Sequence, residues 1–144
     1  MKKIEFYEPY FFMVFGFFHL HRIWGIIDRK SYAHFWIGIL ESRNVFYYGL
    51  MIILALFCLL GILSFLKNIH HNYWWRWIYV LGGSYLLFDL LAIYARFEFW
   101  NELLLWMYDT TSTYWNAVWF LFILLGGFIF CLGIELLINY KSEK

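Results

Sequence analysis

Two long uncharged runs constrain this chain more than any other feature. One extends from Asn44 to Leu66 and the other from Thr110 to Ile134. Each exceeds the roughly 20 apolar residues that a helix needs to cross a bilayer. Two further apolar stretches, Pro9–Ile27 and Ile78–Ala95, are as long but carry charged residues. The pattern predicts a membrane protein with four helical spans.

Composition supports the same class. The chain has 144 residues, of which 64% are hydrophobic and 26% aromatic. A soluble domain of this size has too little interior to bury that much apolar surface. The net charge of +1 gives no indication of a nucleic-acid partner.

We therefore expect an all-α integral membrane protein, a four-span antiparallel transmembrane helix bundle that forms a single domain. The spans are expected at about 9–27, 45–66, 78–96 and 115–140. Two segments between them, Ser31–Ser42 and Phe97–Asp109, are too short to cross a membrane and alternate polar with apolar residues at helical spacing. They are predicted to be short amphipathic helices in the membrane interface.

Basic residues predict the orientation. With four spans, both termini and the middle loop share one side of the membrane, and that side holds Lys2, Lys3, Lys67, Arg76, Lys141 and Lys144. The opposite side holds fewer basic residues: Arg29, Lys30, Arg43 and Arg96. Because cytoplasmic loops carry an excess of lysine and arginine, both termini are expected in the cytoplasm, with the chain in the plasma (inner) membrane.

Charged residues inside the spans point to a site, because charge within a bilayer is costly and is usually kept for function. The first span contains Arg22, and the third contains Asp89 on a stripe of residues spaced three and four apart, namely Gly82, Tyr85, Asp89, Ala92 and Arg96. Such a stripe is expected to face protein rather than lipid. We therefore expect Arg22 and Asp89 to pair, either directly or through His19 or His21. Such a pair would either line a ligand or ion site or only fix the register of the helices.

The predicted depths bring several polar side chains together in the outer leaflet. The candidate ligand-binding residues are His19, His21, Arg22, Asp28, His34, Tyr85, Asp89, Arg96 and Glu98. The sequence assigns no catalytic residue among them.

No metal or cofactor is expected. Residues two apart on a helix, such as His19 and His21, point about 200° apart and cannot ligate one ion. Each is instead expected to form a hydrogen bond within the bundle. Haem is not expected either, because the second, third and fourth spans lack the histidine that a facing axial ligand requires.

Small residues in the fourth span predict close helix packing. Gly126, Gly127, Cys131 and Gly133 lie at separations that repeat along one helix, and Gly127 and Cys131 form a small-xxx-small pair. We expect this pair to serve packing within the chain, with a homodimer as the alternative.

The leading functional prediction is a non-enzymatic plasma-membrane protein. It would bind a lipid-like or small ligand, or a partner membrane protein, through the polar outer-leaflet site, with membrane lipids as its other partners. The alternative is a small membrane enzyme or quinone-type redox subunit using His21, Arg22 and Asp89, or a protomer of a proton-coupled transporter in which Asp89 titrates.

Overall fold

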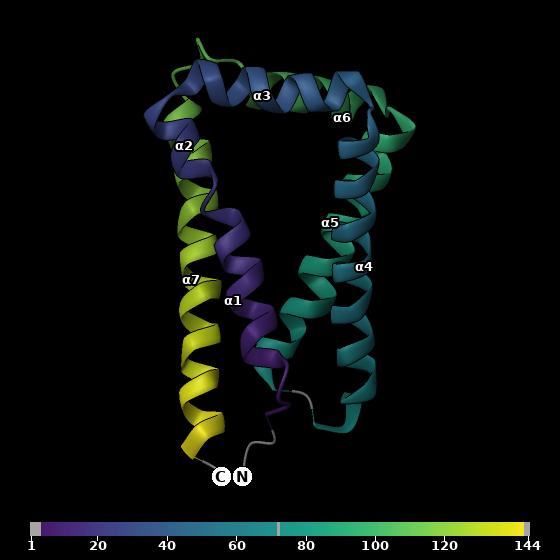
Figure 1. The fold of residues 1–144 in the computed structure, drawn as a ribbon, viewed down its shortest axis with the longest axis vertical. Helices are drawn as coiled ribbons and strands as arrows, with labels where there is room; N and C mark the ends of the chain where they lie inside the picture. The colour runs from purple at the N-terminus through teal and green to yellow at the C-terminus, as the bar shows by residue number, and fades with distance from the viewer. Residues whose placement is uncertain (1–3, 72, 143–144) are drawn as a thin grey trace. The chain divides into compact units, whose positions relative to one another are not determined.

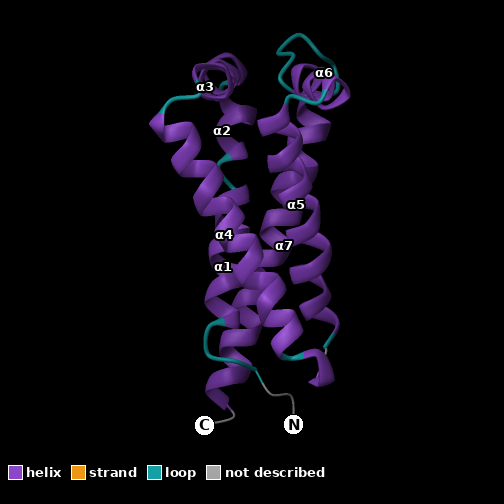
Figure 2. Cartoon of the chain, turned by 90° about the vertical axis from the view of Figure 1, so that its right-hand side faces the viewer, coloured by secondary structure: helices purple, strands orange, loops and turns teal. Residues whose placement is uncertain are grey.

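A computed structural model describes residues 4–71 and 73–142, and every regular element in these ranges is helical (Figures 1 and 2). Two 3-10 turns, η1 (Ile69–His71) and η2 (Trp74–Arg76), link the fourth and fifth α-helices. The α-helices are α1 (Glu8–His19), α2 (Arg22–Ile27), α3 (Arg29–Ser42), α4 (Val45–Lys67), α5 (Trp77–Ala95), α6 (Glu98–Met107) and α7 (Trp115–Ser142).

Four stretches are long and apolar enough to cross a membrane: Glu8–Ile27, Val45–Lys67, Trp74–Ala95 and Trp115–Ser142. They coincide with the four predicted spans to within a few residues, and α3 and α6 lie where short helices were expected. Large apolar side chains such as Leu60 on α4 and Leu121 on α7 remain more than half exposed, at 62% and 66%. Exposed surface of this kind is compatible with contact to lipid.

The chain divides into two compact units. The first comprises residues 4–35 and 107–142 of the described chain, and the second comprises residues 36–106. The division falls inside α3 and at the end of α6. Each unit is therefore described by itself.

In the first unit, α1 runs antiparallel to α7 at backbone contact distance (Figure 1). A methyl group on Gly16 would lie 2.6 Å from the carbonyl oxygen of Gly126. One on Gly133 would lie 2.8 Å from the carbonyl oxygen of Pro9. No side chain fits at either contact, so glycine sets how closely the two helices approach.

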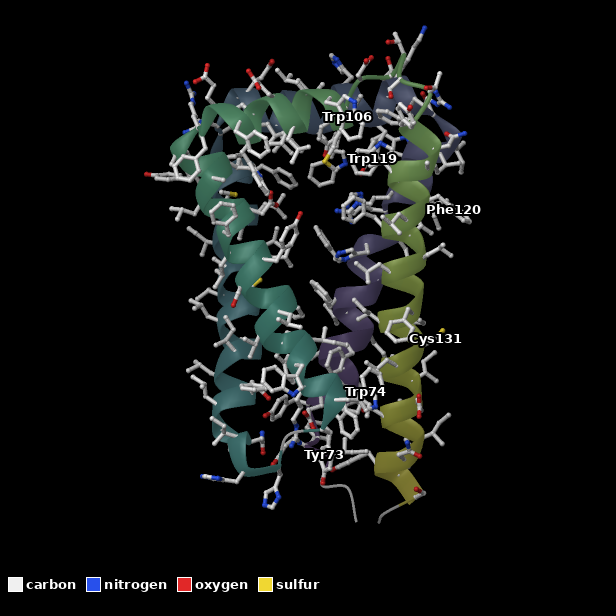
Figure 3. The ribbon with its side chains drawn as sticks, turned by 180° about the vertical axis from the view of Figure 1, so that it is seen from behind. Tyr73, Trp74, Trp106, Trp119, Phe120 and Cys131 are labelled. Carbon is white, nitrogen blue, oxygen red and sulfur yellow. The ribbon has the colours of Figure 1, made fainter. Side chains whose placement is uncertain are left out.

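The predicted role of the pair Gly127 and Cys131 in this packing is wrong. A Cβ on Gly127 would meet no atom within 4 Å, and Cys131 is exposed. Figure 3 shows Cys131 on the other side of α7 from Trp119. Gly126 and Gly133 face α1 because residues seven apart return to nearly the same side of a helix, whereas Gly127 is turned about 100° away.

The first span is not the continuous helix that was predicted. Leu20 and His21 interrupt it, and the amides of Leu20, Ile23 and Trp24 bond to carbonyls three residues back, at 2.9, 3.0 and 3.1 Å. This tighter bonding is of the 3-10 type. The interruption comes directly after His19, whose Cβ lies against Gly126. Beyond the interruption, α2 continues along α7.

In the second unit, α4 and α5 form an antiparallel hairpin. The rings of Phe65 and Trp77 meet at 5.0 Å beside the loop. Midway along, a Cβ on Gly83 would lie 3.2 Å from Ile62. Within this unit, Gly83 rather than Gly82 of the predicted stripe packs on α4, Ala92 is fully buried and Tyr85 is 53% exposed.

We predict that Gly126→Ala lowers the free energy of unfolding by about 1–3 kcal/mol, the usual cost of overpacking a tight contact. The added methyl would lie 2.5 Å from Cβ of His19 and cannot be accommodated without moving α1. Thermal unfolding of the purified protein in detergent measures the effect. Gly127→Ala is the matched control and should be neutral or slightly stabilising, because its methyl meets open space. Equal losses in both variants would contradict the glycine contact.

Candidate functional site

A group of aromatic rings in the first unit surrounds Tyr32 of α3, which is fully buried. Its ring lies 5.4 Å from that of Trp119 and 6.3 Å from that of Trp115, edge to face in both cases. The ring of His21 stacks against it at 5.7 Å with an interplanar angle of 24°. Tyr32 thereby joins α3 to the break in the first span and to the start of α7.

The guanidinium of Arg22 lies against the same aromatic group. Its central carbon is 4.8 Å from the centre of the Phe122 ring and 5.8 Å from that of Trp119. A cation over an aromatic face gains about 2 kcal/mol when desolvated. We call His21, Arg22, Tyr32, Trp119 and Phe122 the Arg22 cluster.

The two tryptophans of α7 differ in how their N–H groups are satisfied. Trp115 donates from Nε1 to the carbonyl oxygen of Gly25, 2.8 Å away. Trp119 is 1% exposed, and its buried Nε1 has no hydrogen-bond acceptor. A buried donor without an acceptor costs about 1–3 kcal/mol. The Arg22 cluster therefore holds a buried donor for which the described residues provide no acceptor.

Both predicted histidine hydrogen bonds are present. Nδ1 of His19 lies 3.0 Å from the carbonyl oxygen of Phe15, which can only accept, so this nitrogen carries the proton. Nδ1 of His21 lies 3.3 Å from the hydroxyl of Tyr32. Burial raises the pKa of that hydroxyl, so Tyr32 keeps its proton and can donate it to an unprotonated Nδ1.

Two carboxylates near the cluster in sequence are held by local hydrogen bonds. Asp28 accepts from the amide of Ser31 at 3.1 Å, and Ser31 also lowers the pKa of the Asp28 carboxyl. Asp109 accepts from the hydroxyl and amide of Thr111 at 2.7 and 2.9 Å, which lowers the pKa of its carboxyl. Both side chains therefore stay ionised at neutral pH.

Asp89 belongs to the second unit and has a partner that the sequence did not suggest. Trp100 of α6 donates from its indole Nε1 to Oδ1 of Asp89, 2.6 Å away. The rings of Phe88 and Trp100 also meet edge to face at 5.2 Å. These two contacts attach α6 to α5.

The remaining predicted site residues lie at the surface. Asp28, His34, Tyr85, Arg96 and Glu98 are all exposed. Because Arg22 lies in the first unit and Asp89 in the second, their pairing stays a prediction.

Sequence reasoning missed the aromatic part of the Arg22 cluster. Tyr32 and Trp119 are two among many aromatic residues of the chain, which hid them. One signal was present: Trp115 and Trp119 are four residues apart at the start of a span and therefore share a helix face.

Two buried charges were also missed. Glu8 and Arg76 are both fully buried. Arg76 donates to the carbonyl oxygen of His71 at 2.6 Å, and Glu8 accepts from the amide of Glu5 at 2.8 Å. In the described residues, no group of three histidine, cysteine or acidic side chains is arranged to hold a metal ion.

No protein-family model, curated protein or solved structure matches this chain.

We predict that Trp100→Phe lowers the free energy of unfolding by about 1–3 kcal/mol, because the Asp89 carboxylate loses its indole donor. In an Asp89→Asn background the same change should cost clearly less, since no charge-assisted bond remains to be lost. Thermal unfolding of the two single variants and the double variant supplies the cycle.

A cycle of Arg22→Gln with Asp89→Asn tests the predicted Arg22–Asp89 pair in the same way, and strictly additive losses would exclude it.

Proposed function

We propose that this chain is a multi-pass plasma-membrane protein that binds an anionic, lipid-like ligand at the Arg22 cluster. In the proposed topology, with both termini in the cytoplasm, this cluster lies in the outer leaflet. The binding itself requires no catalytic group.

The depth of the cluster suits a lipid headgroup. Arg22 begins the last short helix of the first span, and Trp119 lies one turn into α7. Both are near the ends of apolar stretches, where a bilayer changes from hydrocarbon to headgroup. Tyr32, another member of the cluster, belongs to α3, which is too short to cross a membrane. An amphiphile placed here would have its polar group at the level of Arg22.

The observation that carries the proposal is the buried indole N–H of Trp119 without an acceptor. It lies in the same cluster as the guanidinium of Arg22, whose neighbours Trp119 and Phe122 offer ring faces. The positive charge of Arg22 and the indole donor of Trp119, which has no acceptor among the described residues, together favour a ligand rich in negatively charged oxygen, such as a phosphate or carboxylate headgroup.

We predict that Arg22→Gln weakens binding of dioleoylphosphatidylglycerol about tenfold, the loss expected for one charge-assisted hydrogen bond. Native mass spectrometry of the detergent-solubilised protein, titrated with this lipid, measures binding. Dioleoylphosphatidylcholine should bind more weakly to the wild type and show no dependence on Arg22.

Lys30→Gln is the matched control. It removes one exposed positive charge from α3 and should leave binding unchanged. Trp119→Phe should weaken binding as well, because it removes the N–H but keeps an aromatic ring. Equal binding by Arg22→Gln, Lys30→Gln and the wild type would refute the proposed function.

The topology is tested separately. In a variant with Cys58 and Cys131 replaced by serine, we expect Ser112→Cys to react with an impermeant maleimide added to intact cells. Ser142→Cys should react only after the membrane is opened, because it is the last residue of the fourth span, on the side rich in basic residues. Labelling of Ser142→Cys from outside would place the Arg22 cluster at the cytoplasmic face.

A further inference from the structure

In the second unit, a short junction between α3 and α4 reaches the end of α5. Arg43 lies between the two helices in the left-handed conformation, with φ of 44°. Its Nη2 donates to the carbonyl oxygens of Ile93 and Tyr94, at 3.1 and 3.2 Å. These carbonyls belong to the last turn of α5, so Arg43 caps that helix and is fixed in position.

Arg43 and Tyr47 hold donors without acceptors. The guanidinium of Arg43 lies over the ring of Tyr47, 5.5 Å from its centre. Tyr47 is 2% exposed, and its buried hydroxyl has no hydrogen-bond partner in the part of the chain that the structure describes. Nε of Arg43 is also buried without a partner. Side chains on a helix point toward its N-terminus, which directs Tyr47 toward the start of α4.

A second arginine lies at the same place. Arg96 ends α5, again in the left-handed conformation with φ of 56°, and both Arg43 and Arg96 act electrostatically on Tyr47. In the described residues, neither arginine forms an ion pair with a carboxylate, including the nearby Glu41 and Glu98. The N-terminus of α4 adds its own partial positive charge, and the side chain of Asn44 caps one of its amides, that of Tyr47, at 3.0 Å. The junction between α3 and α4 and the end of α5 therefore carry positive charge and buried donors that no anionic group among the described residues balances.

The geometry points to a phosphate-binding site formed by Arg43, Tyr47, Arg96 and the N-terminus of α4. Arg96 is exposed and is the group that an arriving phosphate meets first. Arg43 and Tyr47 then provide the buried donors. Because the junction lies where α4 begins and α5 ends, the phosphate of an anionic lipid is available at the same depth. This site shares no residue with the Arg22 cluster.

Tyr47→Phe is the test variant, because it keeps the ring over which Arg43 lies and removes only the hydroxyl. Binding of dioleoylphosphatidylglycerol by native mass spectrometry should weaken about tenfold. Tyr48→Phe, an exposed neighbour, should bind as the wild type does. Arg96→Gln should weaken binding too, whereas Lys67→Gln, at the far end of α4, should not.

The same measurement in an Arg22→Gln background separates this site from the proposed function. The Tyr47-dependent part of binding should persist there, even if the Arg22 cluster binds no lipid. Inorganic phosphate forms a second arm. Binding that depends on Tyr47 with phosphate alone would assign the site to a free anion, and binding only with phosphatidylglycerol would assign it to a lipid.

Two results would overturn the inference. One is equal binding of both probes by Tyr47→Phe and Tyr48→Phe. The other is a lower unfolding temperature of Tyr47→Phe without added lipid or phosphate, since removing a hydroxyl that has no partner should not destabilise the protein.

Discussion

The contact of α1 with α7 through glycine determines the arrangement of the first unit. Gly16, Gly126 and Gly133 let the two backbones touch, and contacts this close permit only one register. Farther along the same pair, that register brings Trp115 to the carbonyl of Gly25 and Arg22 to the ring of Trp119. The chemistry of the Arg22 cluster thus depends on three positions that carry no side chain.

Aromatic rings are a recurring neighbour of positive charge in this chain. Arg22 lies over Phe122, Arg43 over Tyr47 and Arg76 over Tyr73. A ring face stabilises a cation while adding only apolar surface to its surroundings. Because 26% of the residues are aromatic, a ring face is available to stabilise a cation wherever a span ends. It leaves some guanidinium donors directed at rings rather than at oxygen, as at Nε of Arg43.

The sequence predicted the four long helices and the two short ones, because hydropathy and helical period are local properties. It did not predict the interruption at Leu20 and His21, which contains no proline or glycine and follows a contact with another helix. It predicted close packing through glycine in α7 but chose Gly127 instead of Gly126 and Gly133. The position of α1 decides which of these glycines is covered. Trp100 was missed for a similar reason: a donor from a separate helix has no signature in the segment around Asp89.

Among the described residues, the two that are left-handed without being glycine are both arginines, Arg43 and Arg96. An L-residue in this conformation pays roughly 1–2 kcal/mol that glycine would not. Glycine at either position would relax the backbone, yet it would take the guanidinium away. At Arg43 the hydrogen bonds to Ile93 and Tyr94 offset the strain. At Arg96 the backbone itself offsets the strain, because the left-handed turn brings the amide of Phe97 to the carbonyl oxygen of Ala92, 3.0 Å away, and so closes the end of α5 without any part played by the exposed side chain.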